Sequence, residues 1–296
     1  MIVKNKMIFT GERYIPEYFT NTGDEIVKEH ENRYLSISKL MTNKVVLDAA
    51  CGSGYGSYEI SKYAKNVKGI DISHESVNYA KNKYQSKNLD FQVASVAQLP
   101  FAEEEFDTII SFETIEHISE ELQLLFLQEV KRVIKKDGIF IISTPDKLIY
   151  SDNANYKNEF HIKEFYENEF FNFLSLFFKN VKFFYQSDEI CNVIYSTDTI
   201  NFKINTINDL DINGKYIIAL CSDNIIDDIY ELESISIQNN KLQLVQKRII
   251  ELQKEVEEKN IWAFNLQKEV EDKNNLTLEL QKEVEDKNNL TLELQK

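Results

Sequence analysis

The chain has 296 residues, enough for a sizeable core, and its 34 basic and 49 acidic side chains give a formal charge of −15. A surface this acidic repels phosphate backbones, which argues against nucleic acid and anionic membranes as partners. The cysteines, Cys51, Cys191 and Cys221, form no Cys-x-x-Cys pair, so neither a structural zinc site nor a disulfide framework is expected.

The N-terminus contains no recognisable targeting segment. Its short apolar run is broken by Glu12 and Arg13 and is followed by no small-residue cleavage site. No stretch reaches the roughly 18 apolar residues that a membrane helix needs. We therefore expect a cytoplasmic protein with no transmembrane segment, which reaches the inner face of the membrane only through partners.

Short β-rich runs alternate with helical segments from residue 44 onward. The predicted strands cover 44–50, 67–73, 89–95, 106–112, 138–145, 181–186 and 215–222. The predicted helices cover 57–65, 75–83, 120–135 and 163–178, the last with phenylalanines that indicate core packing. This alternation predicts an α/β fold with a seven-stranded, mostly parallel sheet and helices on both faces.

The last part of the chain has a different character. Residues 188–214 are largely polar and predict no element, and beyond residue 224 the sequence contains no glycine or proline and keeps a helical period. We therefore expect one domain at 1–225, with its core at about 44–145, and a helical extension at 226–296.

The first predicted strand runs directly into a glycine turn, VLDAACGSGYGS, that contains Gly52, Gly54 and Gly56. A strand, a glycine turn and a helix form the nucleotide-cofactor cradle of open α/β sheets. Glycine is needed there because the backbone turns tightly and approaches the ligand without a Cβ atom.

Two kinds of cofactor compete for such a cradle. A dinucleotide fingerprint, G-x-G-x-x-G, requires glycine at position 57, where the chain has Ser57. Asp48, just before the turn, suits a cationic cofactor such as S-adenosylmethionine. Asp71 ends the second strand 19 residues after Gly52 (71 − 52). At this separation a carboxylate can accept hydrogen bonds from ribose hydroxyls. Alternatively, Asp48 caps the turn and Asp71 caps the helix after Ser73.

Residues 44–145 resemble the Rossmann-like core of class I S-adenosylmethionine-dependent methyltransferases. The matching motifs are VLDAACGSGYG, GIDIS and LPFAEEEFDTIISFETIEHI. The resemblance implies that the glycine turn contacts the amino-acid part of the cofactor, that the acid after the second strand binds ribose, and that residues after the third strand flank adenine. It assigns cofactor contacts to Asp48, Ala50, Gly52, Gly54, Gly56, Asp71, Ile72, Ser95 and Val96.

Further segments resemble a narrower group, the methyltransferases encoded with bacterial surface-polysaccharide synthesis, which include O-antigen chain terminators with a coiled coil. These segments are GERYIPE (11–17), EHENRY (29–34), SFETIEHI (111–118), ISTPDKLIYSD (142–152) and NEFHIKEFY (158–166). The resemblance implies a saccharide acceptor and a glycosyltransferase partner. The kinase motifs H-R-D and D-F-G, which belong to some of those relatives, do not occur.

Acid–base chemistry is expected after the fourth strand. Methyl transfer to a hydroxyl requires the acceptor to be positioned and its proton removed, and His117 is the predicted general base. Glu113 and Glu116 are predicted to orient it or to contact the acceptor, unless Glu116 and His117 simply begin the next helix. His161 is a second candidate base, unless it lies at a solvent-exposed helix start.

The N-terminal region is expected to cover the cofactor, with Tyr14 and Arg33 as candidate contacts. Arg33 suits a bidentate contact with the methionine carboxylate. The four histidines include no H-x-x-x-H spacing, which predicts no metal site.

The tail keeps one heptad register from Ile235, and LQKEVEDKNNLTLE at 266–279 is repeated at 280–293. The apolar stripe predicts a coiled coil that forms a homo-dimer or homo-trimer. Each 14-residue copy equals two heptads, so it lengthens the rod without changing the register. The alternative is a single solvated helix supported by pairs such as Glu269 with Lys273.

The sequence thus predicts an S-adenosylmethionine-dependent methyltransferase that acts on a sugar hydroxyl of a surface polysaccharide or its precursor. Two alternatives remain: a non-catalytic coiled-coil scaffold with a degenerate domain, and a methyltransferase for a small-molecule acceptor. An NAD-dependent oxidoreductase is disfavoured by Ser57.

Overall fold

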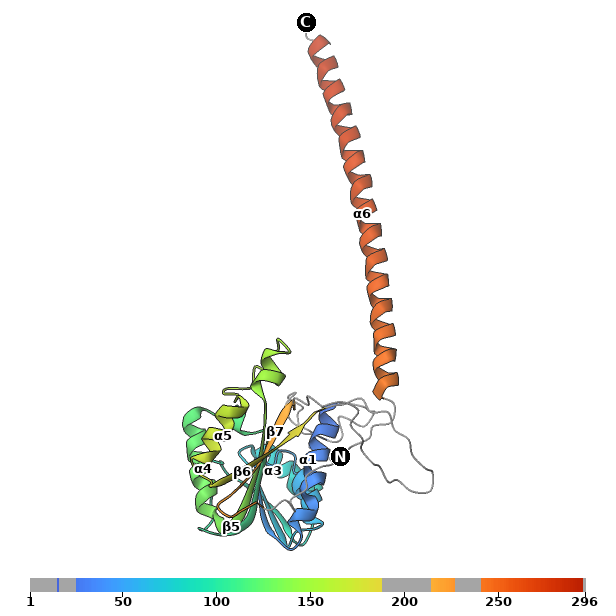
Figure 1. Cartoon of the computed structure of the whole chain (residues 1–296). Coiled ribbons are helices and arrows are strands. Elements are labelled where there is room, and N and C mark those ends of the chain that lie inside the picture. Colours follow the sequence, from blue (N-terminus) through green and yellow to red (C-terminus); the bar gives the residue numbers. More distant parts are fainter. Residues whose placement is uncertain (1–14, 16–24, 188–213, 227–240, 295–296) are drawn as a thin grey trace, which may run out of the picture. The chain divides into compact units, whose positions relative to one another are not determined.

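The computed structural model of the chain describes Ile15 and residues 25–187, 214–226 and 241–294 (Figure 1). The chain divides into two compact units, Met1–Ser236 and Ile237–Lys296. The sequence pattern placed this boundary between residues 225 and 226. Tyr14 and Ile235, to which the sequence assigned a cofactor contact and the start of the heptads, lie outside the described residues.

The first unit is built on a seven-stranded sheet with the strand order β3-β2-β1-β4-β5-β7-β6. All neighbouring strands pair in parallel except β7, which is antiparallel to both β5 and β6. The predicted seven-stranded, mostly parallel sheet is therefore confirmed. The strands are β1 Val45–Ala49, β2 Asn66–Asp71, β3 Leu89–Val93, β4 Phe106–Phe112, β5 Ile134–Pro145, β6 Asn180–Gln186 and β7 Tyr216–Ser222.

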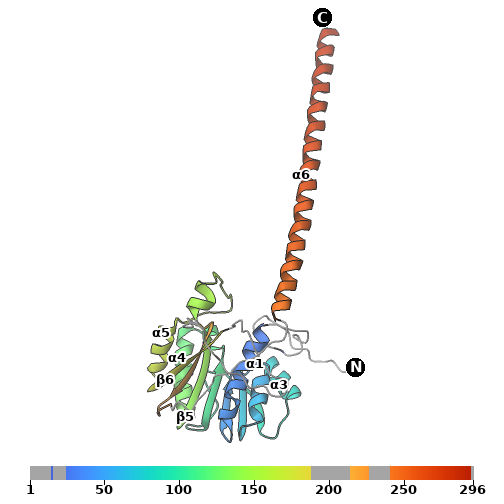
Figure 2. The same ribbon diagram turned by 45° about the vertical axis from the view of Figure 1, so that its right-hand side comes forward.

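Helices cover both faces of this sheet, as predicted (Figures 1 and 2). Successive strand residues point to opposite faces, and each face has its own buried core. Leu47 packs with α4 and α5 on one face, and Val46 packs with α1 and α2 on the other. The helices are α1 Glu25–Ser38, α2 Tyr55–Ser61, α3 His74–Lys83, α4 Glu120–Val133 and α5 Glu167–Ser175, with the short turns η2 Lys39–Met41, η3 Ile115–His117 and η4 Leu148–Asp152.

Local signals explain where α3 and α4 begin. The Ser73 side chain accepts a hydrogen bond from the Ser76 N–H at the start of α3, and Ser119 does the same for the Leu122 N–H at the start of α4. Each hydroxyl satisfies one of the backbone donors that a helix start leaves unpaired.

The predicted helix over 163–178 is shorter, because its first residues are extended. Phe165 forms a parallel β-bridge with Asp146, and its carbonyl accepts from the Lys147 N–H at 2.9 Å. Helix α5 therefore begins only at Glu167. The expected core packing is confirmed for most of the phenylalanines, although Phe171 is 44% exposed.

Helix α1 was not predicted, since its sequence shows few apolar residues between the charged ones. Its inward face is partly polar: Glu29 and Arg33 are buried together with Tyr34 and Ile37. The buried polar residues find partners across the fold, since Glu29 accepts from Lys215 Nζ at 2.7 Å and from the Tyr216 hydroxyl at 3.0 Å. Tertiary contacts therefore stabilise a helix that hydrophobic periodicity alone does not reveal.

Strand β1 marks the point where the strand order reverses, since the chain moves from β1 to β2 and β3 and then returns to β4 on the other side. Ligands of open α/β sheets bind outside the carboxyl ends of the strands at such a point. Among the described residues, no helix is both long and apolar enough to cross a membrane.

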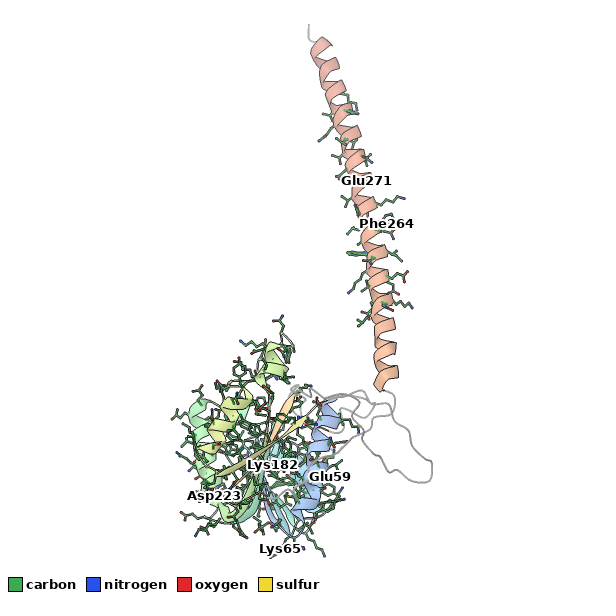
Figure 3. All side chains as sticks on the ribbon, in the orientation of Figure 1. Glu59, Lys65, Lys182, Asp223, Phe264 and Glu271 are labelled. Carbon is green, nitrogen blue, oxygen red and sulfur yellow. The ribbon has the colours of Figure 1, made fainter. Side chains whose placement is uncertain are left out.

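The second unit contains one helix, α6 Lys241–Leu294, of 54 residues. At 1.5 Å per residue it is about 80 Å long. Figure 3 shows side chains projecting from it, with Phe264 and Glu271 labelled. Leu252, Val256, Leu266 and Val270, four of the predicted a and d residues, are 43–57% exposed.

Candidate active site

The loop after β1 has an unusual backbone. Ala50, Gly52 and Gly54 all have positive φ angles, of 66°, 55° and 81°. A Cβ atom on Gly54 would lie 2.6 Å from Ala80 Cβ, so glycine is required there, whereas a Cβ atom on Gly52 would meet nothing within 4 Å. Gly52 thus borders open space, while Gly56 is buried in α2, where a Cβ atom would meet the Tyr34 ring.

Asp71 fixes this loop to the end of β2. Its Oδ2 accepts from the Gly52 N–H at 3.0 Å, and its Oδ1 accepts from the Ser73 N–H at 2.8 Å. Ser73, not Asp71, is the N-cap of α3. The next side chain, Ile72, is 72% exposed.

Asp48 lies deeper, with an exposed fraction of 1%. Its carboxylate accepts from the Tyr34 hydroxyl at 3.1 Å and from the Ser57 hydroxyl at 2.5 Å. Ser57, which broke the dinucleotide fingerprint, is therefore a partner of Asp48. These bonds connect α1, β1 and α2, so Asp48 acts on the loop by holding its surroundings in place.

Burial raises the pKa of Asp48 from 3.8 to about 6, although the hydrogen bonds from Ser57 and Tyr34 lower it in part. Between pH 4 and 6 the folded protein thus binds more protons than the unfolded chain. Stability contributed by this group is complete below the unfolded pKa and is lost as the pH rises through about 6.

We expect Asp48→Asn to flatten this part of the stability profile. Relative to the variant, the wild type is expected to lose on the order of 3 kcal/mol of unfolding free energy between pH 4 and 7, since one pKa unit corresponds to about 1.4 kcal/mol. Urea denaturation of both proteins at several pH values measures the difference. Parallel profiles would contradict an ionisation of Asp48 inside the fold.

Ser95 and Val96 follow β3 at the same edge of the sheet. The Ser95 hydroxyl accepts from the Ala97 N–H at 3.2 Å, and Ser95 forms a β-bridge with Gln98. Val96 is half-buried and packs against the core. Both side chains thus shape the turn after β3, and Ser95 uses its oxygen locally.

Glu113 stands at the carboxyl end of β4 with a φ angle of 50°, which is strained for a residue with a Cβ atom. Its Oε1 accepts from the Ser143 hydroxyl of β5 at 2.6 Å and lies 3.6 Å from Arg33 Nη1. The strain and the two contacts hold this carboxylate between β4, β5 and α1.

Arg33 is 2% exposed, and its guanidinium lies 4.2 Å from the centroid of the Tyr216 ring. Its Nε donates to Gln186 Oε1 at 2.6 Å, whereas Nη1 and Nη2 have no hydrogen-bond acceptor within the described part of the chain. A buried guanidinium with unsatisfied donors is costly unless a further acceptor is present.

Glu116 and His117 lie in η3, and α4 begins only at Glu120. They therefore do not begin that helix, which was the alternative interpretation. Glu116 is fully buried, which raises its pKa well above the usual range, and the nearby charge of Glu113 raises it further. His117 is 28% exposed, and its Nδ1 lies 3.0 Å from the Phe160 carbonyl oxygen.

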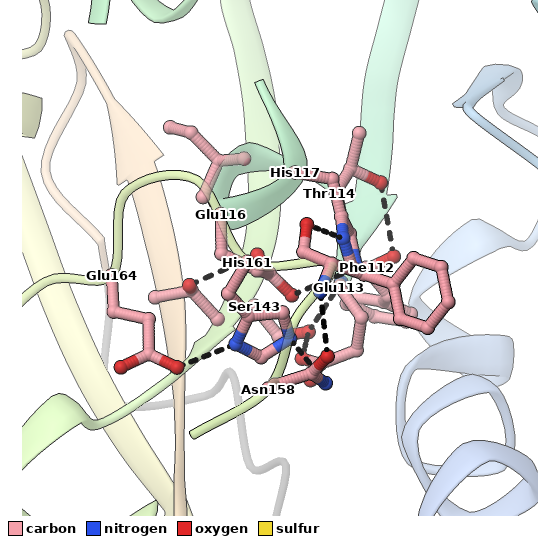
Figure 4. A network of polar contacts seen from close by, with 12 residues as sticks. Phe112, Glu113, Thr114, Glu116, His117, Ser143, Asn158, His161 and Glu164 are labelled. Carbon is pink, nitrogen blue, oxygen red and sulfur yellow. Dashed lines mark hydrogen bonds and ion pairs between the residues drawn. The ribbon is translucent and has the colours of Figure 1, made fainter. Parts of the chain in front are cut away.

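His161 lies beside His117, with ring centroids 4.9 Å apart, although 44 positions separate them in sequence (161 − 117) (Figure 4). Its Nδ1 contacts Glu164 Oε1 at 2.5 Å, and its Nε2 contacts Asn158 Nδ2 at 3.1 Å. Asn158 and Glu164 were not predicted as site residues. Their three-residue spacing on either side of His161 was the available signal.

The predicted site residues therefore form two groups at the carboxyl edge of the sheet. The first follows β1, β2 and β3 and contains the glycine loop, Asp71, Ile72, Ser95 and Val96. The second lies at the ends of β4 and β5 and contains Glu113, Glu116, His117 and His161, with Arg33 beside Glu113. Asp48 and Gly56 lie beneath the first group and support it.

Comparison with known proteins agrees with this architecture. The family described as "Methyltransferase domain" matches residues 40–289, so the chain belongs to the methyltransferase-domain family. It is 31% identical over 156 residues to a probable S-adenosylmethionine-dependent methyltransferase of Mycolicibacterium smegmatis, which covers 52% of this chain and 58% of that protein.

A second relative is a ubiquinone biosynthesis O-methyltransferase of Pelagibacter ubique, 32% identical over 47% of this chain and 54% of that protein. The chain thus spans a little over half the length of these curated relatives. Among solved structures, a complex between the Haloferax volcanii Trm112 methyltransferase activator and the putative methyltransferase matches 68% of this chain and 93% of that chain. Its TM-score is 0.50 at 16% identity, a likeness of fold alone.

Proposed function

We propose that the chain is an S-adenosylmethionine-dependent methyltransferase that methylates a hydroxyl group. The observation that carries the proposal is the placement of the glycine loop, Asp71 and the Glu113–His117 turn at one carboxyl edge of the sheet, around the point where the strand order reverses. Membership in the methyltransferase-domain family supports it.

The residues of the first group fit this cofactor. Gly52 leaves space above the loop, and Asp71 lies where ribose hydroxyls would donate to its remaining lone pairs. The exposed Ile72 side chain offers an apolar surface for the adenosine. When bound, the cofactor supplies a methyl group activated by the sulfonium.

Arg33 also fits the cofactor, because its Nη1 and Nη2 atoms lack acceptors among the described residues. A carboxylate such as that of the methionine moiety would satisfy both nitrogens in a bidentate pair. The Ser95 hydroxyl accepts from the Ala97 N–H, and its O–H can still donate to a ring nitrogen of adenine. We therefore assign the adenine contact to Ile72, Ser95 and Val96.

The second group would receive the acceptor. A carbonyl oxygen can only accept, so His117 Nδ1 donates to Phe160 and Nε2 carries the lone pair. His117 Nε2 would use this lone pair to accept the proton of the acceptor hydroxyl. Glu113 and Glu116 lie close to His117 in the chain, and the His161 ring is held beside the His117 ring. The acceptor oxygen would then attack in line with the methyl–sulfur bond.

The acceptor that we propose is a sugar hydroxyl of a surface polysaccharide or its precursor. Support comes from the segments GERYIPE, ISTPDKLIYSD and NEFHIKEFY, which resemble those of polysaccharide-associated methyltransferases. The same resemblance implies a glycosyltransferase partner and a cytoplasmic location next to the membrane. A small phenolic acceptor is the second candidate, because a ubiquinone biosynthesis O-methyltransferase is 32% identical over part of the chain.

Transfer of a tritiated methyl group from S-adenosylmethionine to matched acceptors distinguishes the two candidates. One set contains nucleotide-activated sugars and oligosaccharides, and the other contains catechols and other phenols. We expect label only in the saccharide set. Label confined to the phenols would replace the saccharide assignment and leave the cofactor assignment intact.

We further propose that α6 forms a homo-oligomeric coiled coil, a dimer or trimer. Support comes from its exposed apolar stripe at a and d positions, which a lone helix would leave in water. The Glu269–Lys273 ion pair at 2.7 Å is compatible with a lone helix as well. Because each 14-residue copy keeps the register, the tail also suits a spacer that joins the catalytic domain to a partner.

Replacing Val256 and Val270 together with lysine is expected to dissociate this oligomer, because two buried layers of the seam would then carry charge. Sedimentation equilibrium measures the mass of the wild type and of the variant. Phe264→Lys is the matched control, since Phe264 is exposed and lies off the stripe. A wild type that sediments at 34.7 kDa, the mass of one chain, would contradict the coiled coil.

A further inference from the structure

We propose that Glu116, His117 and His161 bind one divalent transition-metal cation of the zinc class. One ligand atom from each of the three residues lies within 4.8 Å of the other two (Figure 4). Two imidazole nitrogens and one carboxylate oxygen form a donor set that suits such cations better than calcium or magnesium, which prefer oxygen ligands alone. The proposal that a cation binds depends only on this geometry. The catalytic role of the cation rests on the proposed methyl transfer.

Both histidines are held in the tautomer that a metal requires. The Phe160 carbonyl fixes the proton on His117 Nδ1, and the Glu164 carboxylate fixes it on His161 Nδ1. Each Nε2 therefore carries a lone pair. A carboxylate or a carbonyl that accepts from the distal ring nitrogen is the usual support of a metal-binding histidine.

The orientation of Asn158 confirms the tautomer of His161. Its Oδ1 accepts from the Phe160 N–H at 3.0 Å, so its amide nitrogen faces His161 Nε2 at 3.1 Å and donates to it. A cation would take over this lone pair, and the Asn158 amide would release it. Asn158 Nδ2 thus occupies the place next to His161 Nε2 that the cation would take.

Glu116 supplies the second, independent observation. Its side chain is fully buried, and its Oε1 has no hydrogen-bond partner within the described residues, although it lies 3.9 Å from His117 Nε2. The other oxygen, Oε2, accepts from the Thr144 hydroxyl at 3.0 Å. Buried carboxylate oxygens are rarely left without a partner, and a cation between Oε1 and the two imidazoles would provide one.

The backbone keeps these three ligands together. The Glu116 carbonyl accepts from the N–H groups of Ile162 and Lys163, at 2.7 and 3.1 Å, so the loop that carries His161 is attached directly to η3. Ligands of a tetrahedral metal at about 2.1 Å lie about 3.4 Å apart. The ligand atoms, now within 4.8 Å of one another, would therefore reach this separation by rotation of their side chains. The backbone of η3 and of the loop that carries His161 would not need to move.

The expectation of no metal site rested on spacing along the sequence, which only reveals ligands within one helix. Here one histidine lies in the turn after β4 and the other in the loop before α5, so the fold alone brings them together.

With three protein ligands and a partly exposed His117, a coordination position would remain for an acceptor hydroxyl. The cation would then lower the proton affinity of that oxygen, a role assigned above to the imidazole. The hydroxyl proton leaves to water and the oxygen bonds to the methyl carbon. The carbon–sulfur bond breaks, and its electron pair stays on sulfur.

Titration of the full chain with Co²⁺ after treatment with a chelator tests the site, because Co²⁺ in a nitrogen and oxygen site of low coordination absorbs visible light. We expect one Co²⁺ per chain, displaced by Zn²⁺ but not by an equal concentration of Mg²⁺. His117→Ala and His161→Ala are each expected to weaken Co²⁺ binding by at least about 100-fold, and Glu164→Gln by about 10- to 100-fold. His74→Ala, a histidine at the exposed start of α3, is the matched control.

Binding that is absent, or that survives both histidine substitutions, would overturn the metal site. Thermal unfolding of each variant shows whether it is folded, and Glu116→Gln, which keeps the shape of the buried side chain, must weaken binding as well. Methyl-donor binding measured on the chelator-treated protein separates the two proposals. A chain that binds S-adenosylmethionine but no cation disproves only the metal site, and one that binds the cation but no S-adenosylmethionine disproves only the methyltransferase.

Discussion

Alanine in place of His117 is expected to lower methyl transfer by about 10²- to 10⁴-fold, the usual contribution of a positioned acid–base group. The reason is that Nε2 carries the lone pair beside the buried Glu116, whether it accepts the hydroxyl proton itself or holds a cation that lowers the affinity of the hydroxyl for its proton. Single-turnover assays with a saturating methyl donor measure the effect on the chemical step.

Cofactor affinity is the internal control for this substitution. His117 lies after β4, whereas the glycine loop and Asp71 follow β1 and β2, so the affinity for S-adenosylmethionine should change by less than about twofold. His74→Ala should leave both quantities unchanged. Turnover of the His117 variant within about threefold of the wild type would contradict its role.

The second large effect is expected for Asp71→Ala, which should weaken S-adenosylmethionine binding by about 10- to 100-fold. A hydrogen bond to a charged group contributes about 1.5–3 kcal/mol, and 1.4 kcal/mol corresponds to a factor of ten. The substitution also removes the acceptor of the Gly52 and Ser73 N–H groups, so the glycine loop loses its attachment to β2.

Asp90→Ala is the matched control for this prediction. Asp90 lies near the start of the neighbouring strand β3 and forms an exposed ion pair with Lys68 at 2.7 Å. Such pairs contribute little to stability. Fluorescence titration of the three proteins measures the affinity, and an Asp71 variant that binds as tightly as the wild type would remove Asp71 from the ribose site.

The strands were predictable because buried parallel strands read as short apolar runs between turns. Strand β4 begins and ends at the predicted residues, and the other strand boundaries differ by a few positions. Helix α1 was not predictable in this way, because Glu29 and Arg33 on its buried face pair with Tyr216 of β7 and Gln186 of β6, more than 150 positions away.

In the candidate site, too, local sequence patterns were predictable, whereas contacts between distant segments were not. The glycine turn and Asp71 are adjacent to strands, so local pattern and the geometry of parallel sheets place them at one edge. The role of Ser57 as a donor to Asp48 and the contact between His117 and His161 depend on tertiary packing. Spacing along the chain therefore predicts the placement of the glycine loop and Asp71, whereas the contact between His117 and His161 is visible only in the fold.

Calorimetric titration of the full chain with S-adenosylmethionine is the most direct test of the proposed function. A methyltransferase is expected to bind one cofactor per chain with a dissociation constant between about 1 μM and 1 mM, the range in which most enzymes bind their substrates. The Asp71→Ala variant should bind more weakly under the same conditions. Absence of binding at millimolar cofactor would contradict a functional cradle and favour the non-catalytic scaffold.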